Sequence, residues 1–138
     1  MITEQQITLV QSSFKQVVPI ADVAADLFYT HLFEIDPTLK PLFRGDMREQ
    51  GRKLMQMLSV AVNGLNSLEK IVPAVQDLGR RHVAYGVREQ HYQTVGTALL
   101  WTLEQGLGSE FTPDVKEAWT AVYTLVATTA IEAGYPQN

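Results

Sequence analysis

Apolar residues recur at intervals of three and four along almost the whole chain, and this periodicity limits the possible folds more than any other feature. No stretch alternates apolar and polar residues over the length of a half-buried strand. Prolines and glycines divide the pattern into segments of helical length. The sequence therefore predicts an all-α fold, with about six main helices and one short helix in a single domain spanning residues 1–138.

Capping residues predict where two of the helices begin. Thr3 is followed three residues later by Gln6, and Asp46 by Glu49. In both pairs the side chain of the first residue can accept a hydrogen bond from a free backbone amide of the helix. The side chain of the second residue can accept one from the backbone amide of the first. We therefore expect helices to begin directly after residues 3 and 46.

The second helix should end at Asp36, because Pro37 disfavours helical geometry in the residue before it. The same Asp-Pro pair can open a short helix, which Pro41 keeps from growing long. The apolar residues that the second helix carries at helical spacing are Val23, Leu27, His31 or Leu32, and Ile35.

A histidine stands out in the second half of the chain. A compact helix is expected after Pro73, with Val75, Leu78 and His82 on one face and Gly86 at its end. This spacing points the imidazole of His82 inward. The carbonyl of Leu78, four residues earlier, is in position to accept the ring N–H and to leave the second nitrogen free.

An inward histidine alone is more often a core residue than a metal ligand, so its neighbours must decide. The chain has no cysteine and two other histidines, His31 and His91, both interpreted as structural. A zinc site built from protein ligands alone is therefore not expected. If His82 binds a metal, a cofactor must supply most of the coordination, and haem supplies four nitrogens by itself.

Composition and charge exclude several classes of function. Hydrophobic residues make up 46% of the chain, which favours a folded globular domain. The formal net charge of -4 argues against a broad surface for nucleic acid or anionic lipid. No apolar run reaches the length of a membrane span, and the polar amino terminus does not resemble a secretory signal, so we expect a cytoplasmic protein.

Several segments together resemble the globin family, specifically single-domain bacterial three-over-three globins of the neuroglobin-like kind. The resemblance covers nearly the whole chain, and residues 78–87, LGRRHVAYGV, carry it most specifically. The other segments are FY at 28–29 with LF at 32–33, DPTLKPLF at 36–43, QGRKLM at 50–55, TVGTALL at 94–100 and EAWTAVY at 117–123. The implied fold is an all-α, globin-like three-over-three helical sandwich enclosing a haem.

The resemblance also implies roles for individual residues around haem b. His82 would be the proximal iron ligand, and Phe43 would pack on the porphyrin. Leu54 and Val87 would touch the ring, with Leu78 holding the imidazole. The residues that could meet the propionates at the mouth of the pocket are Lys53, Arg81 and Tyr85.

On the opposite side of the iron, Gln50 occupies the position that most globins fill with histidine. Glutamine is a poor second axial ligand, so an open site for a gas is favoured. Tyr29 and Gln50, beside Leu54, carry donors that would hold dioxygen, because the bound gas is partly negative. Ligation of ferric iron by Tyr29 or Lys53 stays open as an alternative.

These features leave more than one function possible. The preferred function is reversible binding of dioxygen, with nitric oxide and carbon monoxide as further ligands, for storage, scavenging or transport. A nitric oxide dioxygenase would depend on a separate reductase as electron donor. A haem-based gas sensor would need a signalling partner, and a helical bundle without haem is the plainest alternative.

Overall fold

The computed structural model describes residues 2–43 and 45–135 of the chain. Within these residues it contains six α-helices and three short 3-10 helices and no strand, which confirms the all-α prediction. In chain order the elements are α1 (Glu4–Val17), η1 (Val18–Ile20), α2 (Ala21–Ile35), η2 (Pro37–Leu42), α3 (Met47–Asn63), α4 (Leu68–Ala84), α5 (His91–Leu107), η3 (Gly108–Glu110) and α6 (Pro113–Gly134).

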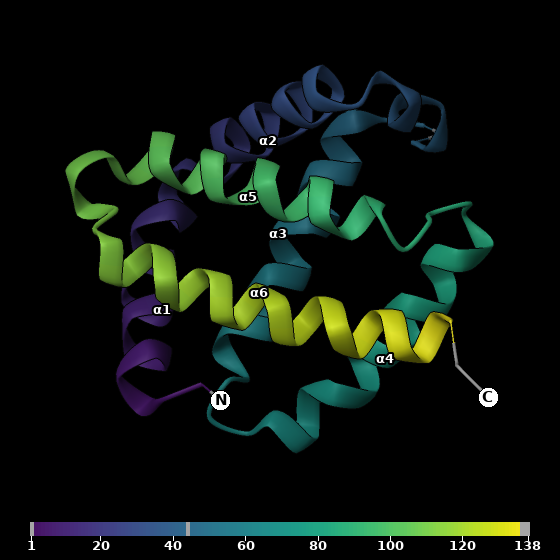
Figure 1. Ribbon diagram of the computed structural model, residues 1–138. Coiled ribbons are helices and arrows are strands. Elements are labelled where there is room, and N and C mark those ends of the chain that lie inside the picture. The colour runs from purple at the N-terminus through teal and green to yellow at the C-terminus, as the bar shows by residue number, and fades with distance from the viewer. Residues whose placement is uncertain (1, 44, 136–138) are drawn as a thin grey trace.

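The helices form two crossed layers of three. Figure 1 shows α6 crossing in front of α1, α3 and α4, and α5 crossing in front of α3. The largest packed interfaces join α4 to α6, α2 to α5 and α1 to α6, and α2 also packs on α3. Crossed helices that pack through ridges and grooves leave side chains from both layers in one interior. The chain thereby gains a common core between its layers.

Of the two predicted capping boxes, the one at Thr3 is confirmed, and the one at Asp46 forms only in part. The Thr3 side chain accepts from the Gln6 amide, and the Gln6 side chain accepts from the Thr3 amide, as a capping box requires. Asp46 also caps its helix, but its carboxylate accepts from the amide of Arg48. A single side-chain cap therefore opens α3 instead of the expected pair with Glu49.

The buried face of α2 differs from the apolar positions picked out in the sequence. Val23 is 57% exposed and Ile35 is 41% exposed. The helix buries Leu32, one of the two alternatives that the sequence offered, together with Ala24, Ala25, Phe28 and Tyr29. The reason is close packing on α3, where a Cβ built on Gly51 would lie 3.0 Å from the Cβ of Ala25. Two helices that approach so closely need small residues at the contact, which Ala25 and Gly51 supply.

The predicted start of α4 after Pro73 is wrong. The helix begins at Leu68 and contains Pro73 in its second turn. Pro73 lies beyond the first turn, so it removes one backbone hydrogen bond and its ring crowds the carbonyl of Glu69, four residues earlier. Burial of Ile71 in the extra turn offsets that loss. As a result His82 lies near the end of a helix of 17 residues.

The core centres on Trp119 of α6, whose side chain is 1% exposed. Its indole Nε1 donates to the Ser13 hydroxyl at 2.9 Å, and its ring lies 6.2 Å from that of Phe14. The buried polar atoms of this contact are thus paired. Across residues 2–43 and 45–135, no helix has both the length and the apolar character needed to cross a bilayer.

Glycines form a close seam between α4 and α6. A Cβ built on Gly79 would lie 2.1 Å from the carbonyl oxygen of Ala130, and one built on Gly134 would lie 2.7 Å from the carbonyl oxygen of Gly79. Backbone atoms occupy the space on both sides of the contact. Unlike a flexible side chain, they cannot move away from an added Cβ. The seam therefore fixes how close α4 lies to α6, one turn before His82.

Substitution of Gly79 by alanine tests the seam. Gly79→Ala should lower the free energy of unfolding by about 2 kcal/mol, because the added methyl group overpacks a backbone contact. Gly106→Ala is the matched control, since its Cβ would meet only the end of the Ile20 side chain at 3.3 Å. The control should be neutral or slightly stabilising in urea denaturation. Equal free energies of unfolding for Gly79→Ala and Gly106→Ala would contradict a tight backbone contact at Gly79.

Candidate functional site

One wall of the candidate site is made by α2 and α3. The Tyr29 hydroxyl donates to the backbone carbonyl of Gln50 at 3.2 Å. This distance is long for a bond between a hydroxyl and a carbonyl, so the contact is weak. The two residues that the sequence assigned to gas binding are therefore adjacent, with the tyrosine hydroxyl at the first turn of α3.

Aromatic rings surround Tyr29. The ring of Phe43 lies edge-on to Tyr29 at 5.2 Å, and Phe33 stacks on Tyr29 at 6.1 Å. Phe28 meets Tyr29 edge-on at 5.0 Å, and Phe33 also meets Phe43 at 5.4 Å. Edge-on and offset arrangements are the favourable ones for such rings. Phe43, expected to pack on a porphyrin, thus belongs to a cluster that surrounds the Tyr29 hydroxyl with apolar surface.

Burial keeps the Tyr29 hydroxyl protonated. Desolvation raises its pKa from 10.0 to about 12, because the charged phenolate would lose its hydration in this apolar setting. At neutral pH the side chain is therefore a neutral donor.

A second wall carries His82 near the end of α4. Its Nδ1 lies 2.9 Å from the carbonyl oxygen of Leu78, as the sequence predicted. Because a carbonyl only accepts, Nδ1 carries the proton and Nε2 presents its lone pair. Burial lowers the pKa of His82, against the opposing effect of the Leu78 bond and together with the nearby charge of Arg81. The imidazole is therefore held neutral, in the state that binds a metal.

Two tyrosines flank the imidazole of His82. The ring of Tyr85 is 6.0 Å away and that of Tyr92, at the start of α5, is 6.3 Å away. Tyr85 is 59% exposed, whereas Tyr92 is 8% exposed and its hydroxyl has no hydrogen-bond partner among the described residues. Sequence reasoning placed Tyr92 on an inward stripe but missed its position beside His82. The apolar periodicity indicated that Tyr92 points inward, but it could not identify His82 of α4 as the neighbouring residue.

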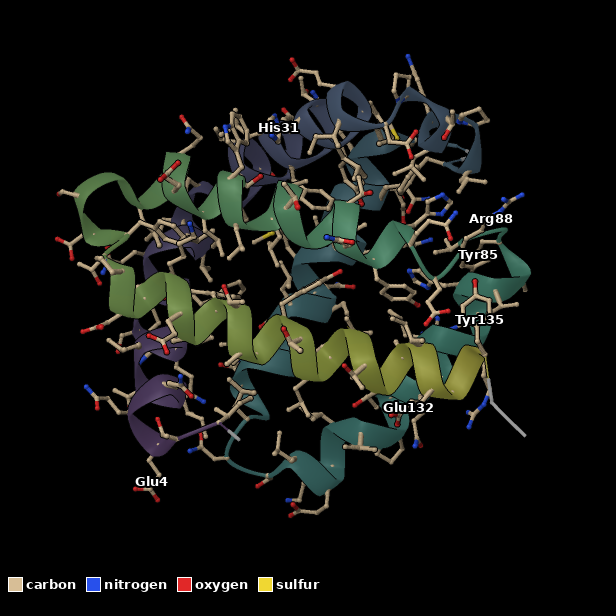
Figure 2. All side chains as sticks on the ribbon, viewed as in Figure 1. Glu4, His31, Tyr85, Arg88, Glu132 and Tyr135 are labelled. Carbon is tan, nitrogen blue, oxygen red and sulfur yellow. The ribbon has the colours of Figure 1, made fainter. Side chains whose placement is uncertain are left out.

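The loop after His82 is fastened to α6 and to η2. The Val87 amide donates to the His82 carbonyl at 2.9 Å, and the Tyr135 hydroxyl donates to the Val87 carbonyl. Figure 2 shows Tyr135 and Tyr85 at the same end of the molecule. Gly86 has a φ of 95°, and a Cβ built on it would lie 3.3 Å from Leu42 Cδ2. The two walls thus adjoin where this loop meets the residue before Phe43.

The remaining predicted contact residues differ in their surroundings. Leu54 is partly buried against the main core. Lys53 is exposed on α3. Arg81 forms an ion pair with Asp77, 3.3 Å between Nε and the carboxylate. Of the two histidines interpreted as structural, His31 stacks on Trp101 with ring centres 4.0 Å apart, and His91 accepts from the Arg88 amide at 2.9 Å.

Two cavities lie outside this site. One, of about 740 Å³, lies between η2 and the start of α5 and includes Asp36 and His91 in its lining. The other, of about 610 Å³, lies between α5 and α6 and includes Tyr92 and Tyr123. Neither of these two cavities is lined by His82, Tyr29 or Gln50.

The donor set fits a group that brings most of its own coordination. His82 offers one neutral imidazole with Nε2 free, and no described residue hydrogen-bonds to that nitrogen. Among the described residues, the Tyr92 hydroxyl, beside this imidazole, is the one buried side-chain polar atom without a hydrogen-bond partner. Buried polar groups are normally paired, so unpaired atoms mark a place for a ligand.

An alkaline titration tests the burial of Tyr29. Tyr29 alone should lower the free energy of unfolding by about 2 to 3 kcal/mol as pH rises from 10.0 to about 12, because the unfolded chain loses this proton first. Tyr92 and Tyr123, whose pKa values burial also raises, add losses of their own. Tyr29→Phe should remove that part of the loss, measured by denaturation at each pH. A variant with the same alkaline loss as the unchanged chain would show that Tyr29 titrates normally.

Comparisons with known proteins agree with this architecture. Residues 26–130 match the globin family. The chain is 32% identical to neuroglobin of Danio rerio over 126 residues, which cover 81% of this chain and 79% of the relative. It is 28% identical over 135 residues to the flavohemoprotein of Vibrio cholerae, covering 96% of this chain but only 34% of that protein's length.

A solved structure shows the same fold. It is a hexacoordinated heme protein from an anhydrobiotic tardigrade, with a TM-score of 0.88 and 16% identity. The match covers 96% of this chain and 95% of the other. The two crossed layers of three helices are therefore the globin sandwich that the sequence predicted, and the chain belongs to the globin family.

Proposed function

We propose that this chain holds a haem through Nε2 of His82 and binds dioxygen reversibly at the opposite face. The observation that carries the proposal is the bond between His82 Nδ1 and the Leu78 carbonyl, which leaves Nε2 as a free ligand in a chain of globin fold. Haem would supply an iron that one imidazole can hold and that can bind a small gas. The absence of cysteine favours non-covalently held haem b.

The proximal residues prepare His82 for this role. The Leu78 carbonyl fixes the tautomer and the plane of the ring, and it makes Nε2 a stronger donor to a metal. The rings of Tyr92 and Tyr85 lie beside the imidazole and limit its movement. Val87 and Tyr135 fasten the following loop. The imidazole is thus oriented before any ligand is present, which lowers the entropy cost of binding.

The distal residues supply donors inside an apolar wall. Tyr29 stays protonated, and its weak contact with the Gln50 carbonyl costs little to break when the hydroxyl turns toward a gas. The Gln50 side chain supplies a second N–H donor. Phe43 and Leu54 would meet the porphyrin and keep water out. Dioxygen, as the more polar ligand, gains more from these donors than carbon monoxide.

The edge of the haem that carries the propionates would contact exposed residues at the entrance of the site. Lys53 and Tyr85 are exposed and suit contact with propionates, and Val87 would touch the ring. Arg81 is less suited, because its guanidinium is already paired with Asp77. These contacts position the group without taking part in gas binding.

A second candidate function is nitric oxide dioxygenation. It is favoured by the similarity to a flavohemoprotein, of whose length this chain matches 34%. The donor pair of Tyr29 and Gln50 suits this reaction as well, but repeated turnover needs electrons from a separate reductase. Stopped-flow mixing of the oxygenated protein with nitric oxide, with and without a flavin reductase, distinguishes a one-time oxidation from sustained turnover.

Removal of the imidazole tests the proposed ligand. The purified chain should take up haem and show a Soret band, and His82→Gly should lose it or bind haem far more loosely. Added imidazole should restore the band, because it refills the position that the side chain leaves. His31→Gly serves as control and should keep the band. A His82→Gly protein with an unchanged spectrum would rule out His82 as the ligand.

Removal of the Tyr29 hydroxyl tests the distal donor. Tyr29→Phe should raise the dioxygen dissociation rate tenfold or more, since a hydrogen bond to a charged group contributes about 1.5 to 3 kcal/mol. Carbon monoxide dissociation should change much less. The measurement is ligand displacement by stopped flow, and equal effects on both gases would contradict a hydrogen bond to dioxygen.

A further inference from the structure

A polar cavity lies between η2 and the start of α5. Its volume of about 740 Å³ falls within the range of roughly 300 to 1000 Å³ that is common for small-molecule sites. Its lining comes from the end of α2 with η2, from the loop after His82 and from the first two turns of α5. Phe43 and Leu54, which would contact a porphyrin, are not part of this lining. The cavity therefore offers a place for a second ligand beside the candidate haem site.

Two opposite charges line this cavity without forming an ion pair. Arg88 lies in the loop before α5, at the same end of the molecule as Tyr85 (Figure 2), and Asp36 caps η2 on the other wall. No ion pair within residues 2–43 and 45–135 includes Arg88 or Asp36. A ligand with one charge of each sign could pair with both groups at once.

Asp36 has a charged oxygen available for a ligand. Its Oδ1 accepts from both the amide and the hydroxyl of Thr38, and no described residue hydrogen-bonds to Oδ2. The bond from the Thr38 hydroxyl lowers the pKa of Asp36 against the opposing effect of burial, and the Thr38 amide and the charge of His91 lower it further. The carboxylate is therefore ionised at neutral pH, with Oδ2 open to a cation.

The α5 side of the cavity supplies hydrogen-bond donors. The Arg88 amide donates to His91 Nδ1 at 2.9 Å, so the proton of the neutral ring lies on Nε2. The Arg88 side chain is exposed, and a guanidinium can bind a carboxylate through two parallel hydrogen bonds. Ile35, which is 41% exposed, and the partly buried Leu42 add apolar surface to the lining. The cavity thus combines a cation, an anion and an apolar wall.

We infer that this cavity binds a small zwitterion, an α-amino acid or a dipeptide, with its carboxylate on Arg88 and its ammonium group on Asp36. A phosphate or another plain anion would meet the Asp36 carboxylate, and an organic cation would meet the Arg88 guanidinium. A neutral ligand would cover both charges without replacing their hydration, which is costly. Only a ligand with both charges avoids these penalties. Neither haem nor a gas takes part in this binding.

Titration calorimetry of the purified chain with leucyl-leucine, before and after addition of haem, tests the inference. The apolar side chains of this dipeptide suit the wall formed by Ile35 and Leu42. The free dipeptide should bind, and its N-acetyl and C-terminal amide forms, which each lack one charge, should bind about tenfold more weakly or worse. Equal affinities of the three forms, or no binding of the free dipeptide at millimolar concentration, would overturn the inference. Loss of binding on addition of haem would also overturn it, because the cavity would then belong to the haem site.

Two variants assign each charge of the dipeptide to one wall. Arg88→Gln should weaken binding of the free dipeptide about tenfold and leave the amide form, which has no carboxylate, unchanged. Asp36→Asn should weaken the free dipeptide and leave the N-acetyl form, which has no ammonium group, unchanged, while asparagine still caps η2. The matched controls outside the cavity are Arg80→Gln, at an exposed position of α4, and Asp46→Asn, at another helix cap. Equal losses in the controls, or equal losses for all three forms of the dipeptide, would overturn the inference.

Discussion

The placement of His82 depends on backbone contact between α4 and α6. Gly79 has no side chain because the Ala130 carbonyl occupies the space that a Cβ would need. Helix α4 therefore lies at a fixed distance from α6, and the end that carries His82 lies with it. The bond from the Leu78 carbonyl then fixes the imidazole within this helix. Long-range packing sets where the ring lies, and a local hydrogen bond sets which nitrogen is free.

Burial has the same consequence for the two walls of the site although their groups have opposite chemistry. Desolvation raises the pKa of the Tyr29 hydroxyl and lowers the pKa of the His82 imidazole. Both side chains are thereby kept uncharged at neutral pH. One remains a hydrogen-bond donor and the other keeps a free lone pair. A single apolar interior thus prepares two different functions without a charged partner for either.

The sequence predicted what depends on local geometry. The capping box at Thr3, the end of α2 at Asp36 and the bond between Leu78 and His82 all involve residues a few positions apart. Contacts between helices were less accessible. The burial of Ala25 depends on Gly51 of another helix, and Tyr92 of α5 lies beside His82 of α4. Apolar periodicity gives the direction of a side chain but not the residue that it meets.

The contact between Tyr29 and the Gln50 carbonyl links the start of α3 to the choice of gas. The Tyr29 hydroxyl has one proton, so under the proposed function it serves either the carbonyl or the ligand. A gas that accepts hydrogen bonds strongly replaces the carbonyl as the acceptor of the Tyr29 hydroxyl. An apolar gas leaves the bond to the carbonyl in place. The Gln50 carbonyl in the first turn of α3 would then keep its hydrogen bond in one complex and lose it in the other. The hydrogen bonding of the backbone would thus depend on the polarity of the bound gas.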